Sequence, residues 1–446
     1  MCQGVGPRAP AAAKEVAVEV SIPGETCAAT MELLRASTRE QLRTVDKGDE
    51  PPIRVLECGV YGESVPVEGA AAEMPMPCLI QRDSRWFCSW RWDSDVLNER
   101  LFRQVGADPK LQQWFGIGGK EADMIFRRVL GYGTGKRADA VGGAAERVAA
   151  QLEECLKPAA LKVFGEEANA EALEASHVYS MYANVLLPGQ IINLHVDVPE
   201  FRGLDRSKCP TWLLAVAHCS GLFEQERVRN TTCVFYPATA AAGALAVFRP
   251  VRPGQSYPPG VAAGKVFPAA RGAAVAMDAD SCNHHSEQAK RVGSCSSSDA
   301  MPLPEMPARA CLEPRGGDGE RPATWVVVDA DSGEDVAEYP EHDLRFSISC
   351  KLHVFSSLAE REEYYANAAR PSSSTLTAAD ILRKLCEDLR SRGVELPAAE
   401  GADREVPLFK LAPLLVDKYI FSTAPSAKDI EKVWEEHYKS VASAAA

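Results

Sequence analysis

The stretch Asn193-Leu-His195-Val-Asp197-Val-Pro-Glu200 carries the residues from which the fold and the chemistry can be inferred. It closes the β-prone runs 177–185 and 190–196, which a Leu-Leu-Pro-Gly turn separates. Because every second side chain of a strand points to the same face, we expect His195 and Asp197 to project together. An imidazole nitrogen beside a carboxylate oxygen is a donor set for a transition metal. This stretch therefore predicts part of a metal site.

Two adjacent histidines, His284 and His285, offer a further ligand downstream. They follow the strand-like run 272–277 and a short polar loop. A histidine just past a strand end, well downstream of the earlier motif, is where a third ligand would arrive in a double-stranded β-helix, and the sequence does not say which of the two faces the metal. We favour His284, which lies nearer the end of the preceding strand, and retain His285 as the alternate. A solvent-exposed histidine pair in a turn is the other interpretation.

A third element, the run 344–352, alternates polar and apolar side chains throughout. One face of such a strand carries Arg345, Ser347, Ser349 and Lys351. The planar guanidinium of an arginine binds a carboxylate through two parallel hydrogen bonds, and a nearby hydroxyl can add a third. We therefore expect Arg345 and Ser347 to bind an anion, with Lys351 as the alternate anchor. An edge strand with a solvated polar face is the competing interpretation.

In this order, the three elements resemble the 2-oxoglutarate/Fe(II)-dependent dioxygenase superfamily over roughly residues 176–356. The resemblance implies that His195, Asp197 and His284 hold Fe(II). Arg345 follows His284 after a longer stretch than is usual in the family. A low-complexity insertion and an expected hairpin between them would account for the extra length.

The same resemblance assigns the co-substrate contacts. Arg345 and Ser347 match the residues that bind the distal carboxylate of 2-oxoglutarate, and Tyr182 and Asn193 match positions that often add contacts. O₂ is implied as the second co-substrate, and ascorbate as a possible stimulant of turnover.

The expected fold is α+β, with a double-stranded β-helix (jelly-roll) core and flanking N- and C-terminal helices. About eight short strands support it, among them the apolar run 212–217. We expect four regions in the chain. They are a flexible lead-in (1–25), a mostly helical N-terminal region packing on the core (26–175), an oxygenase core with a flexible insertion at about 293–321 (176–356), and a helical C-terminal region (357–446).

Helices are expected at several places outside the core. In the N-terminal region these are 26–47, 93–105, 120–131 and 141–157. In the C-terminal region they are 358–369, 377–392 and 426–442. After the insertion, the segments 325–329 and 336–339 are expected to pair as a hairpin.

Composition narrows the class of protein. The net charge of −13 disfavours binding to the phosphates of nucleic acid. No apolar run resembles a secretory signal or reaches the length of a membrane helix, so we expect a soluble, cytoplasmic protein. The 14 cysteines include no C-x-x-C pair, so we expect buried thiols rather than zinc sites or disulfides.

The expected activity is oxidation, typically hydroxylation, of a small organic substrate with release of succinate and CO₂. Hydroxylation of a protein or peptide side chain by the same chemistry is one alternative. A catalytically silent β-sandwich binding module is another, and a redox-neutral metal enzyme a third. Dependence of turnover on iron, O₂ and 2-oxoglutarate separates these hypotheses.

Overall fold

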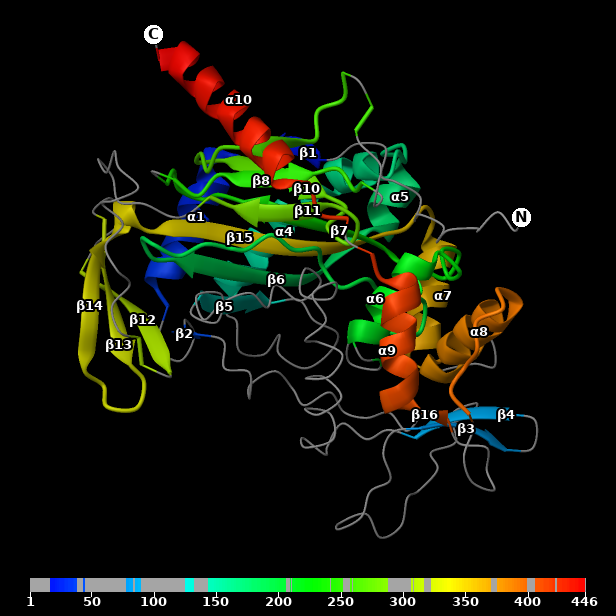
Figure 1. Ribbon diagram of the computed structural model, residues 1–446. Helices are drawn as coiled ribbons and strands as arrows, with labels where there is room; N and C mark the ends of the chain where they lie inside the picture. Colours follow the sequence, from blue (N-terminus) through cyan, green and yellow to red (C-terminus); the bar gives the residue numbers. More distant parts are fainter. Residues whose placement is uncertain are drawn as a thin grey trace.

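The 446-residue chain is seen here in a computed structural model (Figure 1). The structure describes residues 17–37, 43–44, 78–82, 85–89, 125–131, 143–205, 209, 211–240, 242–251, 257–258, 260–287, 306–307, 309–316, 322–369, 375–398, 406–421 and 423–445.

The largest element is a ten-stranded sheet in which every neighbouring pair is antiparallel. Its order is β1 (Ala17–Ser21), β10 (Ala273–Met277), β7 (Arg229–Phe235), β15 (Arg345–Val354), β6 (His177–Leu186), β5 (Phe126–Gly131), β2 (Arg43–Thr44), β12 (Ala310–Arg315), β13 (Thr324–Asp329) and β14 (Asp335–Pro340). The two ten-residue strands, β15 and β6, lie side by side near its middle.

A smaller sheet faces the middle of the large one. It consists of β11 (Asn283–Ser286), β8 (Leu245–Phe248) and β9 (Gly264–Phe267), again antiparallel. Val234 and Val275 of the large sheet share one hydrophobic cluster with Leu245 and Val247 of the small sheet. The facing sides of the two sheets are therefore packed together, and we call these sides the inner faces.

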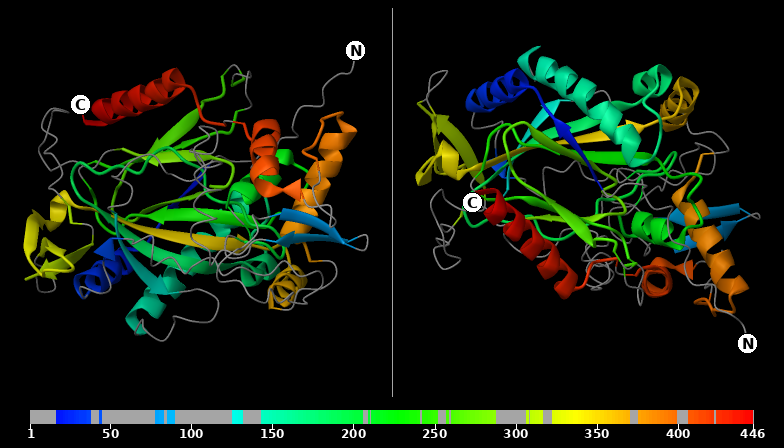
Figure 2. Two further views of the ribbon diagram at one scale, coloured as in Figure 1. Left: turned by 60° about the horizontal axis from the view of Figure 1, so that its bottom comes forward. Right: turned by 90° about the horizontal axis from the view of Figure 1, so that it is seen from above.

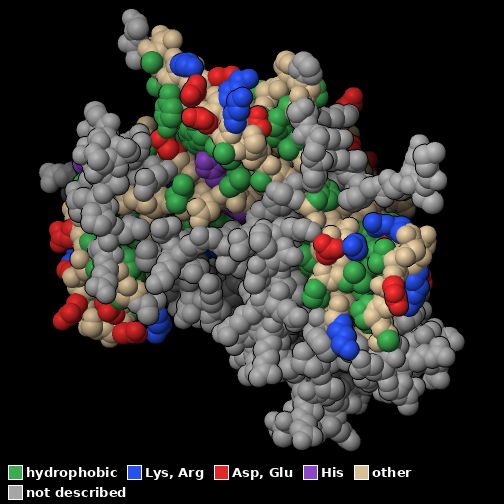
Figure 3. All heavy atoms as spheres, in the orientation of Figure 1, with side chains coloured by type: hydrophobic (Ala, Val, Ile, Leu, Met, Phe, Trp, Pro, Cys, Tyr) green, Lys and Arg blue, Asp and Glu red, His purple; other side chains and the backbone are tan. Residues whose placement is uncertain are grey.

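Helices cover the outer faces of both sheets (Figure 2). On the large sheet these are α1 (Gly24–Arg35) and α4 (Gly143–Val163), whose buried apolar side chains join the main core. On the small sheet it is α10 (Ala427–Ala445), which packs through Val433 and Trp434 while its charged side chains face solvent (Figure 3). Because both outer faces are covered, the strands are buried on two sides.

A second hydrophobic core lies at one end of the sheets. It is formed by α6 (Thr211–Ser220), α8 (Ala378–Ser391) and α9 (Leu408–Tyr419). Beside it is the sheet of β16 (Val406–Pro407), β3 (Cys78–Arg82) and β4 (Arg85–Ser89). The remaining helices are α5 (Ala170–Ala175), α7 (Leu358–Ala369) and the 3-10 turn Glu341–Asp343. The C-terminal region is helical, as expected, and α9 adds a helix that the pattern did not predict.

Several expected elements differ in the structure. The run 212–217 is helix α6 rather than a strand, because nine of the ten residues of this helix are buried and its apolar residues lie on every side. The expected helix 120–131 is wrong where the structure describes it, since Phe126–Gly131 is strand β5. The lead-in 1–25 was expected to be flexible, but Ala17–Ser21 pairs with β10. The expected helix 93–105 lies outside the described residues.

The insertion before β15 is partly structured. The expected hairpin is confirmed, because β13 and β14 pair antiparallel. Residues 310–315 were expected to be flexible, yet they form β12, which pairs with β13 and buries Leu312 completely. Together the three strands extend the large sheet as an arm at its edge (Figure 1). Within the described parts of the chain, no helix has both the length and the apolar character needed to cross a membrane.

Candidate metal centre

The segment that carries His195 is positioned by the small sheet. The backbone N–H of His195 donates to the carbonyl of His284 (3.0 Å), and the N–H of His284 donates back to His195 (2.9 Å). We expected a continuous strand over 190–196, but only this single bridge forms there. Residues 190–196 are otherwise irregular, and the pairing with β11 fixes where His195 lies.

Both imidazoles are oriented by backbone carbonyls. The Nδ1 atom of His195 lies 2.7 Å from the carbonyl oxygen of Asn193, and Nδ1 of His284 lies 3.0 Å from that of Cys282. A carbonyl oxygen can only accept, so each Nδ1 carries the proton. Each Nε2 is left with a lone pair, which is the arrangement that a metal-binding histidine requires.

Asp197 is held through one of its two carboxylate oxygens. Its Oδ2 accepts from the hydroxyl of Thr232 (2.7 Å) and from the ammonium of Lys351 (2.8 Å). Burial alone would raise the pKa of Asp197, but the charge of Lys351 holds it well below its usual range. The carboxylate is therefore ionised, and its Oδ1 remains available for a cation.

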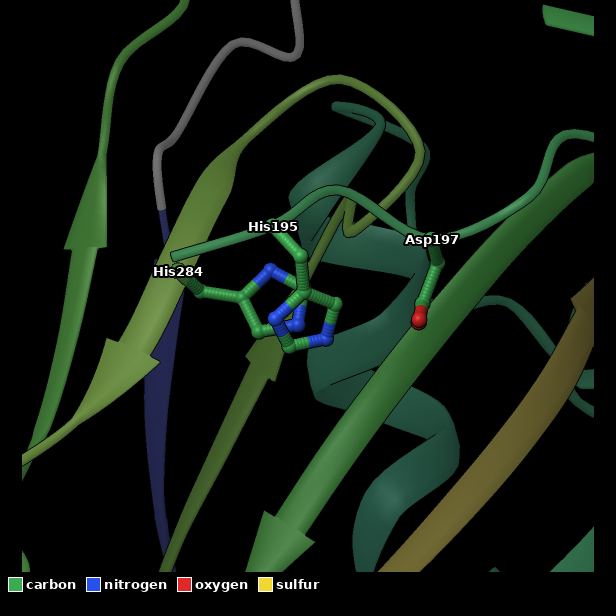
Figure 4. Close-up of side chains that lie close together, drawn as sticks. All are labelled: His195, Asp197 and His284. Atoms are coloured by element: carbon green, nitrogen blue, oxygen red, sulfur yellow. The ribbon is translucent and has the colours of Figure 1, made fainter. Parts of the chain in front are cut away.

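These three side chains converge (Figure 4). One possible ligand atom from each of His195, Asp197 and His284 lies within 4.8 Å of the others. Burial and the nearby His195 lower the pKa of His284 to about 3, so its ring is neutral near neutral pH. Two imidazoles and one carboxylate form a donor set of the facial type, which leaves other coordination positions open.

The loop between β10 and β11 orients two of these three residues. Its Ala279 carbonyl accepts from the backbone N–H of Asp197 (2.8 Å), and its Cys282 carbonyl fixes the ring of His284. The loop is itself held by the buried Arg227, which donates to the Asp278 carboxylate at 2.8 Å. A buried ion pair thus supports the backbone on which the site is built.

His285 is directed away from this site. Its ring stacks on Phe248 with centroids 5.7 Å apart, on the outer face of the small sheet. Its Nδ1 lies 3.2 Å from the Ser286 carbonyl, and its Nε2 accepts from the indole N–H of Trp434 (3.2 Å). Both ring nitrogens are therefore occupied, and the adjacent His284 alone faces His195 and Asp197.

Arg345 is buried at the start of β15, with 1% of its surface exposed. Its Nε donates to the carbonyl of Gly243 (2.8 Å) and its Nη2 to the hydroxyl of Tyr236 (3.0 Å). Its Nη1 is also buried and has no hydrogen-bond partner among the described residues. A Cβ at Gly243 would lie 2.3 Å from the Arg345 side chain, so only glycine fits there. This orphaned donor matches what an anion-binding guanidinium needs.

The other residues expected to contact the co-substrate differ in their surroundings. Ser347 is buried on the same face of β15 as Arg345. Lys351 is also on this face but is already paired with Asp197. Tyr182 lies opposite Ser349 in the neighbouring strand. Asn193 acts through its backbone carbonyl, which fixes the ring of His195.

Sequence reasoning missed several residues that support the site. Thr232 and Tyr236 belong to one inner face of β7 and its continuation, and Gly243 precedes β8. Asn184 donates to Ser349. Only Gly243 carried a signal, because a glycine before a buried strand often marks a close approach of another group. The remaining partners come from segments distant in the sequence.

Comparison with known proteins gives weak similarities. No protein-family model matches the chain, and no curated protein matches its sequence. A 2OG-Fe(II) oxygenase family oxidoreductase from Burkholderia pseudomallei matches at 12% identity and a TM-score of 0.25, covering 52% of this chain and 70% of its own. A Pseudomonas putida prolyl-4-hydroxylase matches at 9% identity and a TM-score of 0.20, with the same coverage.

A third solved structure is the non-haem alpha-ketoglutarate-dependent carbocyclase SnoK from nogalamycin biosynthesis. It matches at 10% identity and a TM-score of 0.26, covering 62% of this chain and 78% of its own. The solved structures that this chain resembles thus include a 2OG-Fe(II) oxygenase family member, and all three similarities are low.

Proposed function

We propose that this protein is an Fe(II)- and 2-oxoglutarate-dependent oxygenase. The observation that carries the proposal is the convergence of His195, Asp197 and His284 within 4.8 Å, with both Nδ1 protons held by carbonyls. Such a set presents two nitrogens and one oxygen to an Fe(II) ion and leaves positions for co-substrates. A catalytically silent binding module has no need of two histidines in this shared tautomer.

The strand arrangement supports a double-stranded β-helix for this core. In chain order, β6 lies in the large sheet, the His195 segment borders the small sheet, and β7 returns to the large one. Next, β8 and β9 lie in the small sheet, β10 in the large, β11 in the small and β15 in the large. The chain thus winds back and forth between two packed antiparallel sheets, as a jelly roll does.

Arg345 is the proposed anchor for the distal carboxylate of 2-oxoglutarate. Its Nε and Nη2 are held by Gly243 and Tyr236, so its side chain is fixed before a ligand arrives. The buried Nη1 then offers a charge-assisted hydrogen bond, worth about 1.5–3 kcal/mol. Ser347 lies two positions along the same face and can add a hydroxyl contact.

The residues around Asp197 restrict how it can bind a metal. Lys351 and Thr232 both donate to Oδ2, which leaves Oδ1 as the carboxylate oxygen available to a metal. When bound, Fe(II) with 2-oxoglutarate and O₂ would supply the oxidising chemistry, with succinate and CO₂ as products. The chain's own task is to orient the three ligands and bind the co-substrate in a packed, water-poor interior.

The test is an anaerobic Fe(II) titration followed by an assay of succinate release that requires O₂ and 2-oxoglutarate. Wild type should bind one Fe(II) per chain, and His195→Ala or Asp197→Ala should lose most of it. His342→Ala is a matched control, since this histidine is exposed. Iron content in the His195 and Asp197 variants equal to wild type would remove the metal assignment.

Several finer points stay predictions. These are a small organic substrate rather than a protein side chain, stimulation by ascorbate, a cytoplasmic location, and co-substrate contacts from Tyr182 and Asn193. Succinate release that rises on addition of candidate small molecules, and not on addition of peptides, would favour a small organic substrate.

A further inference from the structure

A second arginine lies on the inner face of the large sheet. Arg127 in β5 pairs with Asn184 in β6. The adjacent Arg128 points the opposite way and donates to the Leu33 carbonyl and the Ser37 hydroxyl, on the side covered by α1. Because neighbouring side chains of a strand alternate, Arg127 projects toward the face that carries Arg345.

The side chain of Arg127 is held in a defined position. Its Nε donates to the Oδ1 of Asn184 at 2.9 Å, and its guanidinium carbon lies 4.4 Å from the centre of the Tyr182 ring. The Nδ2 of Asn184 donates in turn to the hydroxyl of Ser349 (3.2 Å). This second bond fixes the amide so that its oxygen faces Arg127. The half-buried guanidinium is thus oriented by three inner-face side chains.

The far end of this guanidinium has no hydrogen-bond partner among the residues that the structure describes. Neither Nη atom of Arg127 donates to a described residue, and no described carboxylate forms an ion pair with it. Since Nε donates to Asn184, the two Nη groups remain free to donate together to one ligand, and we call this pair of donors the fork. That fork matches the spacing of the two oxygens of a carboxylate.

Arg127 lies on the same sheet face as residues that contact the candidate metal centre. Arg127, Asn184 and Ser347 stand in register on three neighbouring strands, so the outer two backbones are about 10 Å apart. Along β15 from Ser347, the same face continues to Lys351, whose ammonium touches Asp197. A molecule bound at Arg127 could therefore extend across β6 toward the metal ligands.

Among the described residues, no carboxylate forms an ion pair with Arg127. Lys351 is paired with Asp197, and Arg345 would be paired with the distal carboxylate of 2-oxoglutarate. The other co-substrate carboxylate would face the metal. Among the described residues, Arg127 is then an inner-face cation without a paired carboxylate.

We propose that Arg127 binds a carboxylate of the substrate, so that the enzyme acts on carboxylic acids. The proposal rests on the proposed function for the chemistry of the site, but the carboxylate recognition can be measured separately. Asn184 and Tyr182 orient the guanidinium. Its two Nη groups donate hydrogen bonds to the carboxylate of the substrate, and the rest of the substrate lies toward the metal.

The test measures binding of simple probes to protein saturated with Fe(II) and 2-oxoglutarate without O₂. The probes are acetate, butyrate and phenylacetate, each compared with its neutral amide by saturation-transfer NMR. Wild type should bind at least one acid about tenfold more tightly than its amide, as expected for one charge-assisted fork. Arg127→Gln should abolish this preference, and Arg127→Lys should retain part of it because the charge remains.

The matched control is Arg315→Gln, an exposed arginine paired with Asp335 on the β12–β14 arm. It should keep the full preference for the acid. Equal binding of every acid and its amide by wild type overturns the proposal, and so does a preference that survives in Arg127→Gln. A loss of 2-oxoglutarate affinity in Arg127→Gln as large as the loss of probe binding would also overturn it, by assigning Arg127 to the co-substrate.

Failure of the proposed function gives a different result. If wild type binds neither Fe(II) nor 2-oxoglutarate, the oxygenase assignment falls, and the probes are then titrated against the metal-free protein. An acid preference that depends on Arg127 would still support the carboxylate site in that case. Its absence would overturn the site as well.

Discussion

The inner and outer faces of strand β15 differ in chemistry although their residues alternate along one segment. The outer face carries Phe346, Ile348, Cys350 and Leu352, which are buried in the main core beneath α4. The inner face carries Arg345, Ser347, Ser349 and Lys351. Burying polar and charged groups costs free energy unless partners compensate them. The outer face therefore stabilises the fold, and the inner face contributes less apolar burial and carries the side chains of the proposed binding site.

Strand β11 repeats the contrast in two adjacent histidines. His284 is on the inner face with a free Nε2 directed at its neighbours in the metal centre. His285 is on the outer face, where Phe248 and Trp434 use its ring for packing and one hydrogen bond. The same residue type thus belongs to the proposed metal site on one face and has a structural role on the other.

The largest expected effect is on stability at the outer face. Phe346→Ala should lower the free energy of unfolding by about 3–5 kcal/mol, because it removes a buried ring that packs on Trp325. Ser349→Ala, on the inner face, should cost only about 1 kcal/mol, the net worth of one hydrogen bond. Denaturant unfolding of the metal-free proteins measures both. Equal losses would break the contrast between the faces.

The two histidines of β11 provide the next test. His284→Ala should weaken Fe(II) binding by on the order of 100-fold or more. Losing a residue that only hydrogen-bonds to a metal ligand already costs about 10–100-fold in metal affinity, and this variant removes a ligand itself. His285→Ala should keep the iron content of wild type. Anaerobic Fe(II) titration of both variants gives the answer, and iron lost only in His285→Ala would reverse the assignment.

A smaller effect is expected along the inner face of β15. Arg345→Ala should raise the half-saturating concentration of 2-oxoglutarate by at least about tenfold, with Fe(II) content nearly unchanged. The half-saturating concentration for Arg345→Lys should lie between those of wild type and Arg345→Ala, because an ammonium keeps the positive charge but not the paired donors of a guanidinium. Lys351→Ala should affect 2-oxoglutarate less, since its ammonium is paired with Asp197.

Succinate formation as a function of 2-oxoglutarate concentration compares these variants, with Arg315→Ala as the control on the arm. A large rise in Lys351→Ala with none in Arg345→Ala would transfer the anchor role to the lysine. No change in either variant would argue against the co-substrate site.

The smallest effect concerns the contact between α10 and the outer face of β11. Trp434→Phe removes the indole N–H that donates to His285 while keeping an aromatic ring. Stability should fall by about 1 kcal/mol, and Fe(II) affinity should stay at the wild-type value. Thermal unfolding and the metal titration together check this. Weakened iron binding would show that the outer face also tunes the metal centre.

Local sequence periodicity accounts for much of this chemistry. The alternation in 344–352 predicted which side chains of β15 share a face, and β15 has that pattern. The position of His284 and His285 just past an expected strand narrowed the third candidate ligand to these two histidines. The prediction that His195 and Asp197 point together holds, but for a different reason. Contacts with His284 and Ala279 hold them, in place of the strand expected at 190–196.

The sequence by itself determined the residue types and their two-residue spacing, because the period of a strand is a property of the local backbone. Only the tertiary structure decided which face is inner, and so which histidine of the pair faces His195. It also decided that Lys351 pairs with Asp197 and that Arg345 keeps an unpartnered Nη1. Such choices depend on contacts between segments far apart in the chain, and periodicity contains no information about them.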